Sequence, residues 1–211
     1  MNRVIKRGKF KNTYNPQKTN QGIGKYFINI QNIVASMTLD TKLDLDRLHQ
    51  EVLPQTYYHP KIFPGLIYRP ENYPVTILFF RSGKINCTGA KSNEIVYESL
   101  NGMHRMLIDA GLVPPTSKNQ IRIANIVSSA FLSHRIRLGD VARDDHRSPQ
   151  ILSIDYEPEQ FPGLVLKLVE PRVVILLFLS GKIVCTGALD FQMIEQAIEQ
   201  ADQLVEKYYF T

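Results

Sequence analysis

Four phenylalanines stand out because the same spacing occurs in two parts of the sequence. Phe63 and Phe80 are seventeen residues apart, and so are Phe161 and Phe178. A phenyl ring does no acid–base or nucleophilic chemistry, but a ring that stays exposed can wedge between flat stacked groups. The pattern therefore predicts binding through apolar contact, provided that the fold keeps these rings out of the core.

Side chains suited to catalysis are scattered by comparison. The five histidines lie in different segments without a nucleophile or carboxylate motif around them, and no glycine-rich loop suits a phosphate. Cys87 and Cys185 occupy equivalent places in strand-like sequence, where reduced and buried thiols are expected. We therefore predict that the chain is not an enzyme and has no metal site and no cofactor.

The composition is that of a folded protein with one basic end. The chain has 211 residues, of which 44% are hydrophobic, and it lacks both an apolar run of membrane-spanning length and a signal peptide. We expect it to be neither membrane-spanning nor secreted. Residues 1–26 carry seven basic and no acidic side chains, whereas the remainder has 18 basic and 20 acidic ones. This arm is predicted to be disordered, and either contacts phosphates or a nuclear import receptor or has no specific partner.

The sequence contains one unit written twice. Residues 78–90, LFFRSGKINCTGA, recur as residues 176–188, LLFLSGKIVCTGA, with ten of thirteen positions identical. Phe-Pro-Gly-Leu at 63–66 and Asn-Ile-Val at 32–34 recur in the same way, at 161–164 and 125–127. Two copies of about ninety residues are typical of paired half-domains that share a core. We predict a first repeat over 27–115 and a second over 116–211.

Periodicity predicts the same order of elements in both repeats. The second repeat is longer, because Asn32 and Asn125 are 93 residues apart while Phe63 and Phe161 are 98 apart, and we place the insertion in the polar stretch 140–150. Strands are expected over 28–37, 63–69, 75–81, 85–90, 121–129, 161–167, 173–179 and 183–188, and helices over 43–53 (behind the N-cap Asp44), 92–110 and 191–208.

Antiparallel pairing predicts which side chains share a face of the sheet. Pairing of 63–69 with 75–81 places Phe63 opposite Phe80, and the same spacing places Phe161 opposite Phe178. A turn at 82–84 places Phe80 opposite Asn86 and Leu78 opposite Thr88. One face then carries Phe63, Ile67, Leu78, Phe80, Asn86 and Thr88, and the other carries Leu66, Tyr68, Ile77 and Phe79.

The face with the phenylalanines is expected to be exposed, because helices are available to cover only one side of the sheet. A wide, uncharged face of this kind implies a ligand. The minor groove of DNA is one candidate, since apolar side chains can wedge between base steps while Asn and Thr bond to base edges. A second sheet or a partner protein is the alternative.

The duplicated motifs Asn-Ile-Val, Tyr-x-Pro-x-x-Phe, Phe-x-Ser-Gly-Lys and Cys-Thr-Gly-Ala resemble those of the TATA-box-binding protein family. The resemblance covers residues 27–210. It implies an α+β fold, a saddle-shaped pseudo-twofold duplication in which a curved ten-stranded antiparallel sheet has four helices on its convex side. It also implies a DNA-bending general transcription factor that recognises TATA-like promoter elements and nucleates assembly of the initiation complex.

The resemblance assigns roles to residues of this sequence. Intercalation between bases falls to Phe63, Phe80, Phe161 and Phe178. Minor-groove contacts fall to Asn32, Val34, Leu78, Asn86, Thr88, Asn125, Val127, Leu176, Val184 and Thr186. Phosphate contacts fall to Arg69, Ser82, Lys84, Lys91, Lys167, Arg172, Ser180 and Lys182.

Some positions depart from the family pattern. Asn86 stands where the family usually has valine, as at Val184, so its amide is expected either to bond a base edge, including a guanine amino group, or to point to water or a neighbouring strand. Ile62 and Tyr73 stand where arginine is common, so we expect a weaker salt dependence of DNA binding.

Protein partners follow from the same resemblance. Glu157 and Glu159 match the acidic stirrup that contacts factor IIB, although Gln160 replaces the usual leucine. The final helix is acidic, which makes factor IIA and negative regulators doubtful partners. A competing interpretation is a divergent relative that acts mainly as a protein-interaction or regulatory module with weak or altered DNA specificity. The basic arm favours the nucleus, with the cytoplasm of an archaeal cell or a viral factor as alternatives.

Overall fold

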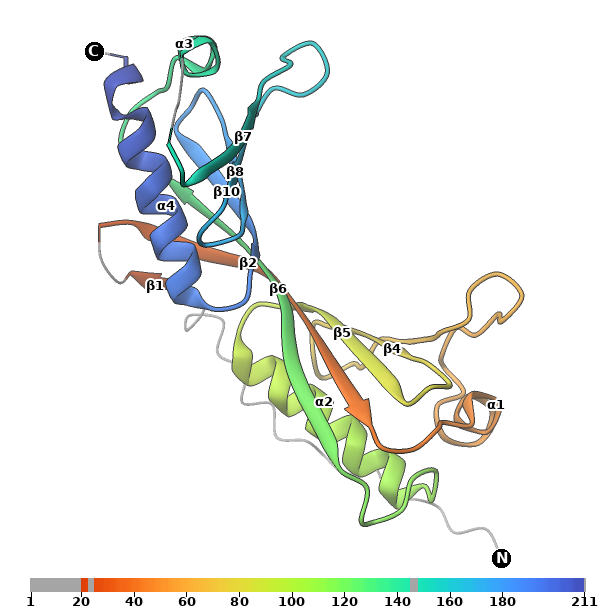
Figure 1. The fold of residues 1–211 in the computed structure, drawn as a ribbon. Helices are drawn as coiled ribbons and strands as arrows, with labels where there is room; N and C mark the ends of the chain where they lie inside the picture. The colour runs from red at the N-terminus through yellow and green to blue at the C-terminus, as the bar shows by residue number, and fades with distance from the viewer. Residues whose placement is uncertain (1–19, 23–24, 145–147, 211) are drawn as a thin grey trace, which may run out of the picture.

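One curved antiparallel sheet of ten strands runs through the whole molecule (Figure 1). The computed structural model describes residues 20–22, 25–144 and 148–210. The strand order is β3-β4-β5-β2-β6-β10-β9-β8-β7, and β1 pairs with β2 beside this path. The strands are β1 Asn20–Gly22, β2 Phe27–Leu39, β3 Leu66–Tyr68, β4 Thr76–Phe79, β5 Lys84–Ala90, β6 Asn119–Phe131, β7 Ile151–Asp155, β8 Leu164–Leu168, β9 Val174–Leu177 and β10 Lys182–Ala188.

The two long strands β2 and β6 join the halves of the molecule. Each has 13 residues, and they pair with each other along most of their length. β2 also pairs with β5 of the first repeat, and β6 pairs with β10 of the second. Because the same two strands belong to both halves, the halves form one continuous sheet with a shared core, as the duplicated sequence predicts.

The two long helices, α2 and α4, cover the convex side of the sheet, and the short α1 and α3 lie at its two ends (Figure 1). Helix α2 packs on β2, β5 and β6, and α4 packs on β9 and β10. Both begin at a side-chain cap, since Ser92 accepts a hydrogen bond from the Ile95 N–H and Asp190 accepts one from the Met193 N–H. The helices are α1 Leu45–Arg47, which continues into a π-helical turn Leu48–Val52, then α2 Asn93–Asp109, α3 Leu138–Arg143 and α4 Phe191–Val205, which ends in a 3-10 turn Glu206–Tyr208.

The core lies between the sheet and these helices. In β2 the odd-numbered Ile33, Ala35 and Met37 are buried, because alternate side chains of a strand point to the same face. Cys87 and Cys185 are both buried and free, as expected. Burial raises the pKa of the Cys185 thiol to about 12, so this thiol stays protonated and unreactive. No helix in the described part of the chain is long and apolar enough to cross a bilayer.

The elements predicted from periodicity all occur, with ends that differ by a few residues. Asp44 caps α1, since its carboxylate accepts a hydrogen bond from the Arg47 N–H at 3.0 Å. Two strands were not predicted from the pattern, namely β1 and β7. The first repeat reduces the counterpart of β7 to a single bridge between Tyr57 and Ile67, which explains why the two halves differ in strand number.

The predicted hairpin registers are wrong by two residues. Leu66 pairs with Phe79 and Ile67 with Leu78, so Gly65, rather than Phe63, lies level with Phe80. In the next hairpin Leu78 pairs with Asn86 and Thr76 with Thr88. The second repeat has the same shift, since Leu164 pairs with Leu177. A shift of two leaves every side chain on its predicted face, because the side-chain period of a strand is also two.

The prediction of a disordered arm over 1–26 is wrong at its end. Strand β1 pairs with β2 through Asn20–Gly22. Lys25 and Tyr26 also bind the Asp202 carboxylate of α4, each at 2.5 Å. The chain before β2 is held there because these two donors reach a carboxylate that is nearly buried. Residues 1–19 and 23–24 of the predicted arm lie outside the described residues.

The predicted insertion lies close to where the repeats stop matching. The backbone bond from Leu43 N–H to Arg81 C=O recurs as Ile136 N–H to Leu179 C=O. Ile136 therefore still follows its first-repeat counterpart by 93 residues, as Asn125 follows Asn32. The pairing of Asp155 with Val165 matches that of Tyr57 with Ile67. At Asp155 the repeats are therefore already 98 residues apart, as Phe161 is from Phe63. The extra residues therefore lie between 136 and 155, a segment that includes the predicted stretch 140–150; residues 145–147 lie outside the described residues.

Candidate nucleic-acid interface

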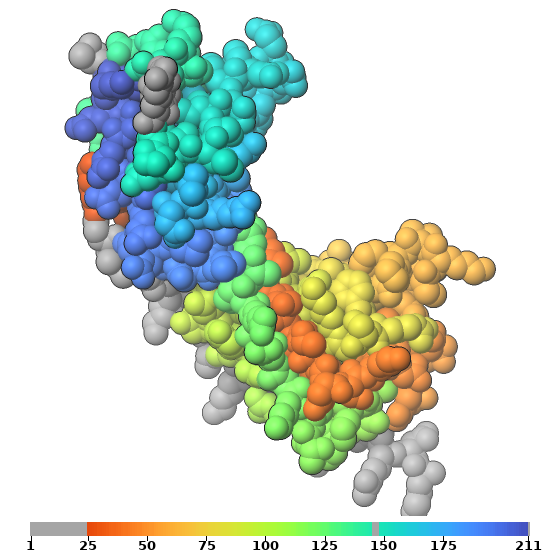
Figure 2. Space-filling model, viewed as in Figure 1, coloured from red at the N-terminus to blue at the C-terminus, as the bar shows by residue number. Residues whose placement is uncertain are grey.

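The concave side of the sheet is open, and Figure 2 shows the hollow between the two halves. None of the residues predicted to face the minor groove is fully buried, and none is fully exposed. This intermediate exposure is that of side chains packed against sheet neighbours on their flanks and uncovered above. The set comprises Asn32, Val34, Leu78, Asn86, Thr88, Asn125, Val127, Leu176, Val184 and Thr186.

The four phenylalanines form two ring pairs on this side. Phe63 and Phe80 meet edge to face with centroids 6.0 Å apart, and Phe161 and Phe178 do so at 5.9 Å. None of the four is buried, and Phe161 is 38% exposed. The structure therefore brings each predicted pair together and leaves it uncovered by helices. Edge-to-face packing fixes each ring against its partner, so that the pair forms a rigid apolar projection.

Two glycines that the sequence analysis did not single out support these pairs. A Cβ on Gly65 would lie 2.6 Å from the Phe63 ring and 3.0 Å from the Phe80 ring, and a Cβ on Gly163 would lie 2.7 Å and 3.1 Å from the matching atoms. Each phenylalanine pair thus rests on a bare glycine backbone. The repeated Phe-Pro-Gly-Leu motif was the available signal, since a glycine repeated beside a ring indicates close approach.

Two asparagines at the centre of the face are held in one orientation. The Asn32 Oδ1 accepts a hydrogen bond from the Gly89 N–H at 2.7 Å, and the Asn125 Oδ1 accepts one from the Gly187 N–H at the same distance. Thr88 and Thr186 lie beside the two amides, at 3.4 Å from Asn32 Nδ2 and Asn125 Nδ2 respectively. Because the oxygen is engaged by the backbone, the amide presents its N–H donors to the concave side.

One cross-strand row differs between the halves. In the first half, Leu78, Asn86 and Ser36 are neighbours on adjacent strands, and in the second, Leu176, Val184 and Ser129 occupy the same places. Ser129 accepts a hydrogen bond from Gln31 Nε2 at 2.8 Å. The Asn86 side chain, in contrast, has no hydrogen-bond partner among the described residues.

The predicted phosphate-binding residues lie at the edges and turns of the sheet. Ser82 and Ser180 accept hydrogen bonds from the N–H groups of Lys84 and Lys182, which tightens the two equivalent turns. Lys167 is the exception, since it is half-buried and its Nζ lies 3.5 Å from Asp155 Oδ2. The exposed members are Arg69, Ser82, Lys84, Lys91, Arg172, Ser180 and Lys182.

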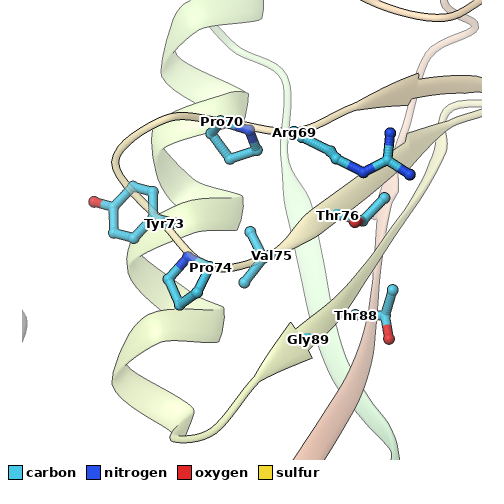
Figure 3. Close-up of a pocket in the computed structure, with 8 residues that line it drawn as sticks. All are labelled: Arg69, Pro70, Tyr73, Pro74, Val75, Thr76, Thr88 and Gly89. Carbon is cyan, nitrogen blue, oxygen red and sulfur yellow. The ribbon is translucent and has the colours of Figure 1, made fainter. Parts of the chain in front are cut away.

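An open pocket of about 360 Å³ adjoins the first-half edge of the concave face (Figure 3). Arg69, Thr76 and Thr88 point to one side of it, while Tyr73 lies on the other side of the loop. Arg69 has no carboxylate partner in the described chain, unlike its counterpart Lys167. Its guanidinium is therefore free to bind an anion beside the face.

The two loops that lead into the phenylalanine pairs carry opposite charge. The second-half loop has exposed Glu157, Glu159 and Gln160, and the Gln160 amide donates a hydrogen bond to the Glu157 carboxylate. The equivalent first-half loop has Lys61 and Ile62, and Ile62 is 80% exposed. Each loop has the tight backbone bond that leads into its phenylalanine, from Phe161 N–H to Glu157 C=O and from Phe63 N–H to His59 C=O.

Two further aromatic rings on the second half were missed in the sequence. Phe131 at the end of β6 is 63% exposed, and Phe27 at the start of β2 is 57% exposed. Phe131 lies beside Lys182 of β10, on the row that follows Val184 and Ser129. Its first-half counterpart, beside Lys84, is Thr38. No repeat marks these rings, so the sequence offered no signal for them.

Comparison with known proteins places the chain in a family. The sequence model described as "Transcription factor TFIID (or TATA-binding protein, TBP)" matches residues 27–110 and 120–208. The chain belongs to the TATA-binding protein family. The family is one of transcription factors, and this member is not an enzyme. In the described residues, no three His, Cys, Asp or Glu side chains gather in a way that suits a metal ion.

Several archaeal members of the family are similar over most of the chain. The TATA-box-binding protein of Methanopyrus kandleri is 42% identical over 85% of this chain and 96% of its own length. That of Thermoplasma acidophilum is 44% identical over 85% and 95%. The solved structure of Methanococcus jannaschii TBP superposes with a TM-score of 0.73 at 36% identity, over 85% of this chain and 98% of its own. These relatives give no support to the nuclear location expected from the basic arm.

Proposed function

We propose that this chain is a general transcription factor that binds TATA-like promoter DNA in the minor groove, bends it and nucleates assembly of the initiation complex. The observation that carries the proposal is the pair of uncovered phenylalanine clusters on one uncharged concave face. The names of the similar archaeal proteins support DNA with a TATA element as the ligand. They lend no support to an interaction module with weak DNA binding.

Bending follows from the rigidity of the two ring pairs. Phe63 with Phe80 enters one base step and Phe161 with Phe178 enters another, and each insertion unstacks the bases at a cost of a few kcal/mol. The widened groove then lies against the apolar concave face, whose burial offsets that cost. TA steps unstack most easily, so deformability selects TATA-like sequence even where no side chain bonds a base.

Direct reading of bases falls to the centre of the face. Asn32 and Asn125 present N–H donors, and the minor-groove edges of A·T pairs offer only acceptors. A G·C pair adds an amino donor at the same place, which faces these donors without a partner. The remaining minor-groove set, from Val34 to Thr186, packs on sugars and base edges.

Each repeat is proposed to cover one half of the site, residues 27–115 one half and residues 116–211 the other. Their edges supply the phosphate contacts, through Arg69, Lys84 and Lys182 together with the other residues assigned to that role. These charges are few, so the affinity is expected to depend less steeply on salt than in a member with more arginine at the edge. Residues 1–26 carry seven further basic side chains, of which Lys25 is paired with Asp202 on α4.

The second-half loop is proposed as the contact for a factor IIB-like protein. Glu157 and Glu159 are exposed at its tip and offer two carboxylates to basic side chains. The variant Glu159→Lys should lose the ternary complex while it still shifts a TATA duplex. Lys61→Glu, in the matching first-half loop, is the control and should keep the ternary complex. Equal ternary binding by both variants would contradict this contact.

Bending by the wild-type chain tests the main proposal. A TATA duplex with a donor and an acceptor dye at its ends should show increased energy transfer on binding, and a gel shift should give the affinity. Phe161→Ala with Phe178→Ala should reduce both signals strongly, because one of the two kinks is lost. Phe210→Ala, which removes another exposed ring, is the matched control. Equal and weak binding by the wild type and the double variant would favour the protein-interaction alternative.

The similar proteins named above are archaeal, so an archaeal type of initiation system is proposed in place of a nuclear one. Factor IIA and negative regulators stay doubtful partners because the surface of α4 and of the turn that follows it is acidic, with Glu195 and Glu199 on the helix and Glu206 in the turn. Transcription from a TATA promoter with purified archaeal polymerase and its factor IIB homologue would check the assignment. Failure to support initiation there would exclude that system.

A further inference from the structure

We infer that Asn86 lets the first half of the concave face accept a G·C pair next to its kink, whereas Val184 makes the second half reject one. The inference rests on the proposed function and adds a base preference that is different at the two ends of the site. It starts from a difference between two positions that the fold makes equivalent.

The surroundings of the two positions match closely. Asn86 pairs with Leu78 on β4 and with Ser36 on β2. Val184 pairs with Leu176 on β9 and with Ser129 on β6. Both are half-buried on the concave side, two residues from the lysine that begins the strand. Asn86 is therefore placed towards the ligand as Val184 is, and the chemical difference is an amide against two methyl groups.

Asn86 differs from the other two asparagines of the face because its oxygen is free. Asn32 and Asn125 each accept a hydrogen bond from a glycine N–H at 2.7 Å. Asn86 has no such bond within the described residues, and neither does its neighbour Ser36. Ser129, the counterpart of Ser36, is instead occupied by Gln31. The first half thus keeps an uncommitted amide and hydroxyl where the second half has a valine and an engaged serine.

This chemistry fits the minor-groove edge of a G·C pair. That edge carries the guanine amino donor between two acceptors, whereas an A·T edge carries acceptors alone. The Asn86 Oδ1 can accept from the amino group and its Nδ2 can donate to an acceptor, so the amide suits either pair. The Val184 methyls can do neither, and they leave the amino group desolvated and unpaired.

The position of Asn86 also determines which base pair it meets. Phe80 bonds across the hairpin to Lys84, so Asn86 is the diagonal neighbour of the wedge on the same face. The pair that Asn86 reads therefore lies next to the base step opened by Phe63 and Phe80. A site with G·C at one end would be bound in one direction, with that end under the first half.

Three duplexes built on one palindromic A·T tract test the inference whichever way round the protein binds. One has the uninterrupted tract, one has a G·C pair next to a single kink, and one has G·C pairs next to both. Affinity is measured by fluorescence anisotropy and expressed as a ratio to each protein's own affinity for the A·T duplex. The affinity of the wild type should fall by less than about threefold with one G·C pair, and by about a further tenfold with two.

Variants should redistribute this tolerance. Asn86→Leu nearly keeps the shape of asparagine without its polar atoms. This variant and Asn86→Val should each lose about tenfold in affinity with the first G·C pair. Val184→Asn should tolerate both pairs. The combined exchange of Asn86→Val with Val184→Asn should behave as the wild type does. Moving the single G·C pair along the tract controls for its exact placement.

The outcomes separate this inference from the proposed function. Ratios that are the same for wild type, Asn86→Leu and Val184→Asn would overturn the inference while the A·T duplex is still bent. No bending of the A·T duplex by any of these proteins would instead contradict the proposed function. A loss by Asn86→Val without a loss by Asn86→Leu would also overturn the inference, because it would assign the effect to size and not to the amide.

Discussion

The two halves of the concave face have one geometry and two chemistries. From the edge to the centre, one row reads Arg69, Thr76 and Thr88 in the first half, and Lys167, Val174 and Thr186 in the second. The next rows replace Asn86 by Val184 and Thr38 by Phe131. The first half is therefore the more polar one at three equivalent places, and its cation at the edge is the one without a carboxylate partner among the residues described.

The same contrast appears behind the sheet. The chain at the start of each long strand is held by the helix of the opposite repeat. Lys25 and Tyr26 bind Asp202 on α4, whereas Asn119 Nδ2 lies 2.9 Å from His104 Nδ1 on α2. Asp202 and His104 are 98 residues apart, as are the repeated phenylalanines. The duplication thus preserves the contact while one half uses a carboxylate and the other a neutral ring.

The comparison teaches that the repeat preserves most of the concave face as well as the core, since Asn32 and Asn125 match, as do Thr88 and Thr186, and that the asymmetry is confined to a few rows. Core positions such as Cys87 and Cys185 keep their type, because a change of volume there costs stability. The few concave positions that differ have no covering neighbour to fit, so the ligand alone limits which side chains they can carry. Asymmetry of the ligand site is then the expected result.

Removal of a phenylalanine pair should have the largest effect. Phe63→Ala with Phe80→Ala, and Phe161→Ala with Phe178→Ala, should each abolish one kink and weaken binding about a hundredfold or more, as expected for two anchoring rings. The second pair should matter more, because its half offers fewer polar contacts to hold the duplex. Energy transfer across a labelled duplex and gel-shift affinities would measure both. Equal residual bending with the two variants would contradict the predicted difference between the two halves.

Lowering the pH should reduce the free energy of unfolding through a different contact in each half, and over a different pH range. Burial lowers the pKa of His104, so the stability that its neutral form contributes is lost as the pH falls below its unfolded value of about 6.5. At Asp202, burial alone would raise the pKa, but the bonds from Lys25, Tyr209 and Tyr26 together lower it. Its contribution is present above about pH 3.9 and is lost as the pH falls further.

Urea unfolding across pH would check this order. His104→Gln should flatten the decrease in the free energy of unfolding between pH 7 and pH 5, as expected for a group of pKa about 6.5. Asp202→Ala should cost about 2 kcal/mol at neutral pH, because three donors lose a charged acceptor. Lys61→Glu, on an exposed loop, is the control. A pH profile that His104→Gln leaves unchanged would contradict the assignment.

The glycines beneath the rings should matter less than the rings themselves. Gly65→Ala and Gly163→Ala should push each ring pair out of its packed position. The affinity for the bent duplex should then fall about tenfold, as expected for the cost of an off-rotamer ring. Thermal unfolding should change little, because the rings lie outside the core. The two sites have similar contacts, so the two variants should resemble each other. A large loss of stability without a loss of bending would exclude a positioning role.

The edge cations should give the smallest and most unequal effects. Arg69→Ala should reduce the slope of log affinity against log salt by about 1, as expected for one lost phosphate contact. Lys167→Ala should reduce it less, because Asp155 already neutralises part of its charge. Asp155→Asn should restore the full contribution of Lys167. Equal slopes for Arg69→Ala and Lys167→Ala would show that this ion pair does not persist on DNA.

The sequence by itself determined the duplication, the order of the main elements and the faces of the strands. Those features depend on local rules: alternation assigns a face, and a capping side chain such as Asp44 begins a helix. Phe63, Phe80, Phe161 and Phe178 could be assigned to one side because a register error of two residues does not change the face. The family, and with it the saddle, could be identified from the repeated motifs.

Only the tertiary structure decided the register, the contacts of the arm and the chemistry of the rows. Hairpin register depends on the backbone of the turns, and the positive-φ Gly83 and Gly181 each lie one residue beyond the centre of their hairpin, not at it. The bond between Tyr26 and Asp202 joins residues 176 apart, and no local pattern reports such a distance. Whether Asn86 has a free oxygen likewise depends on neighbours from three strands, which meet only when the sheet has formed.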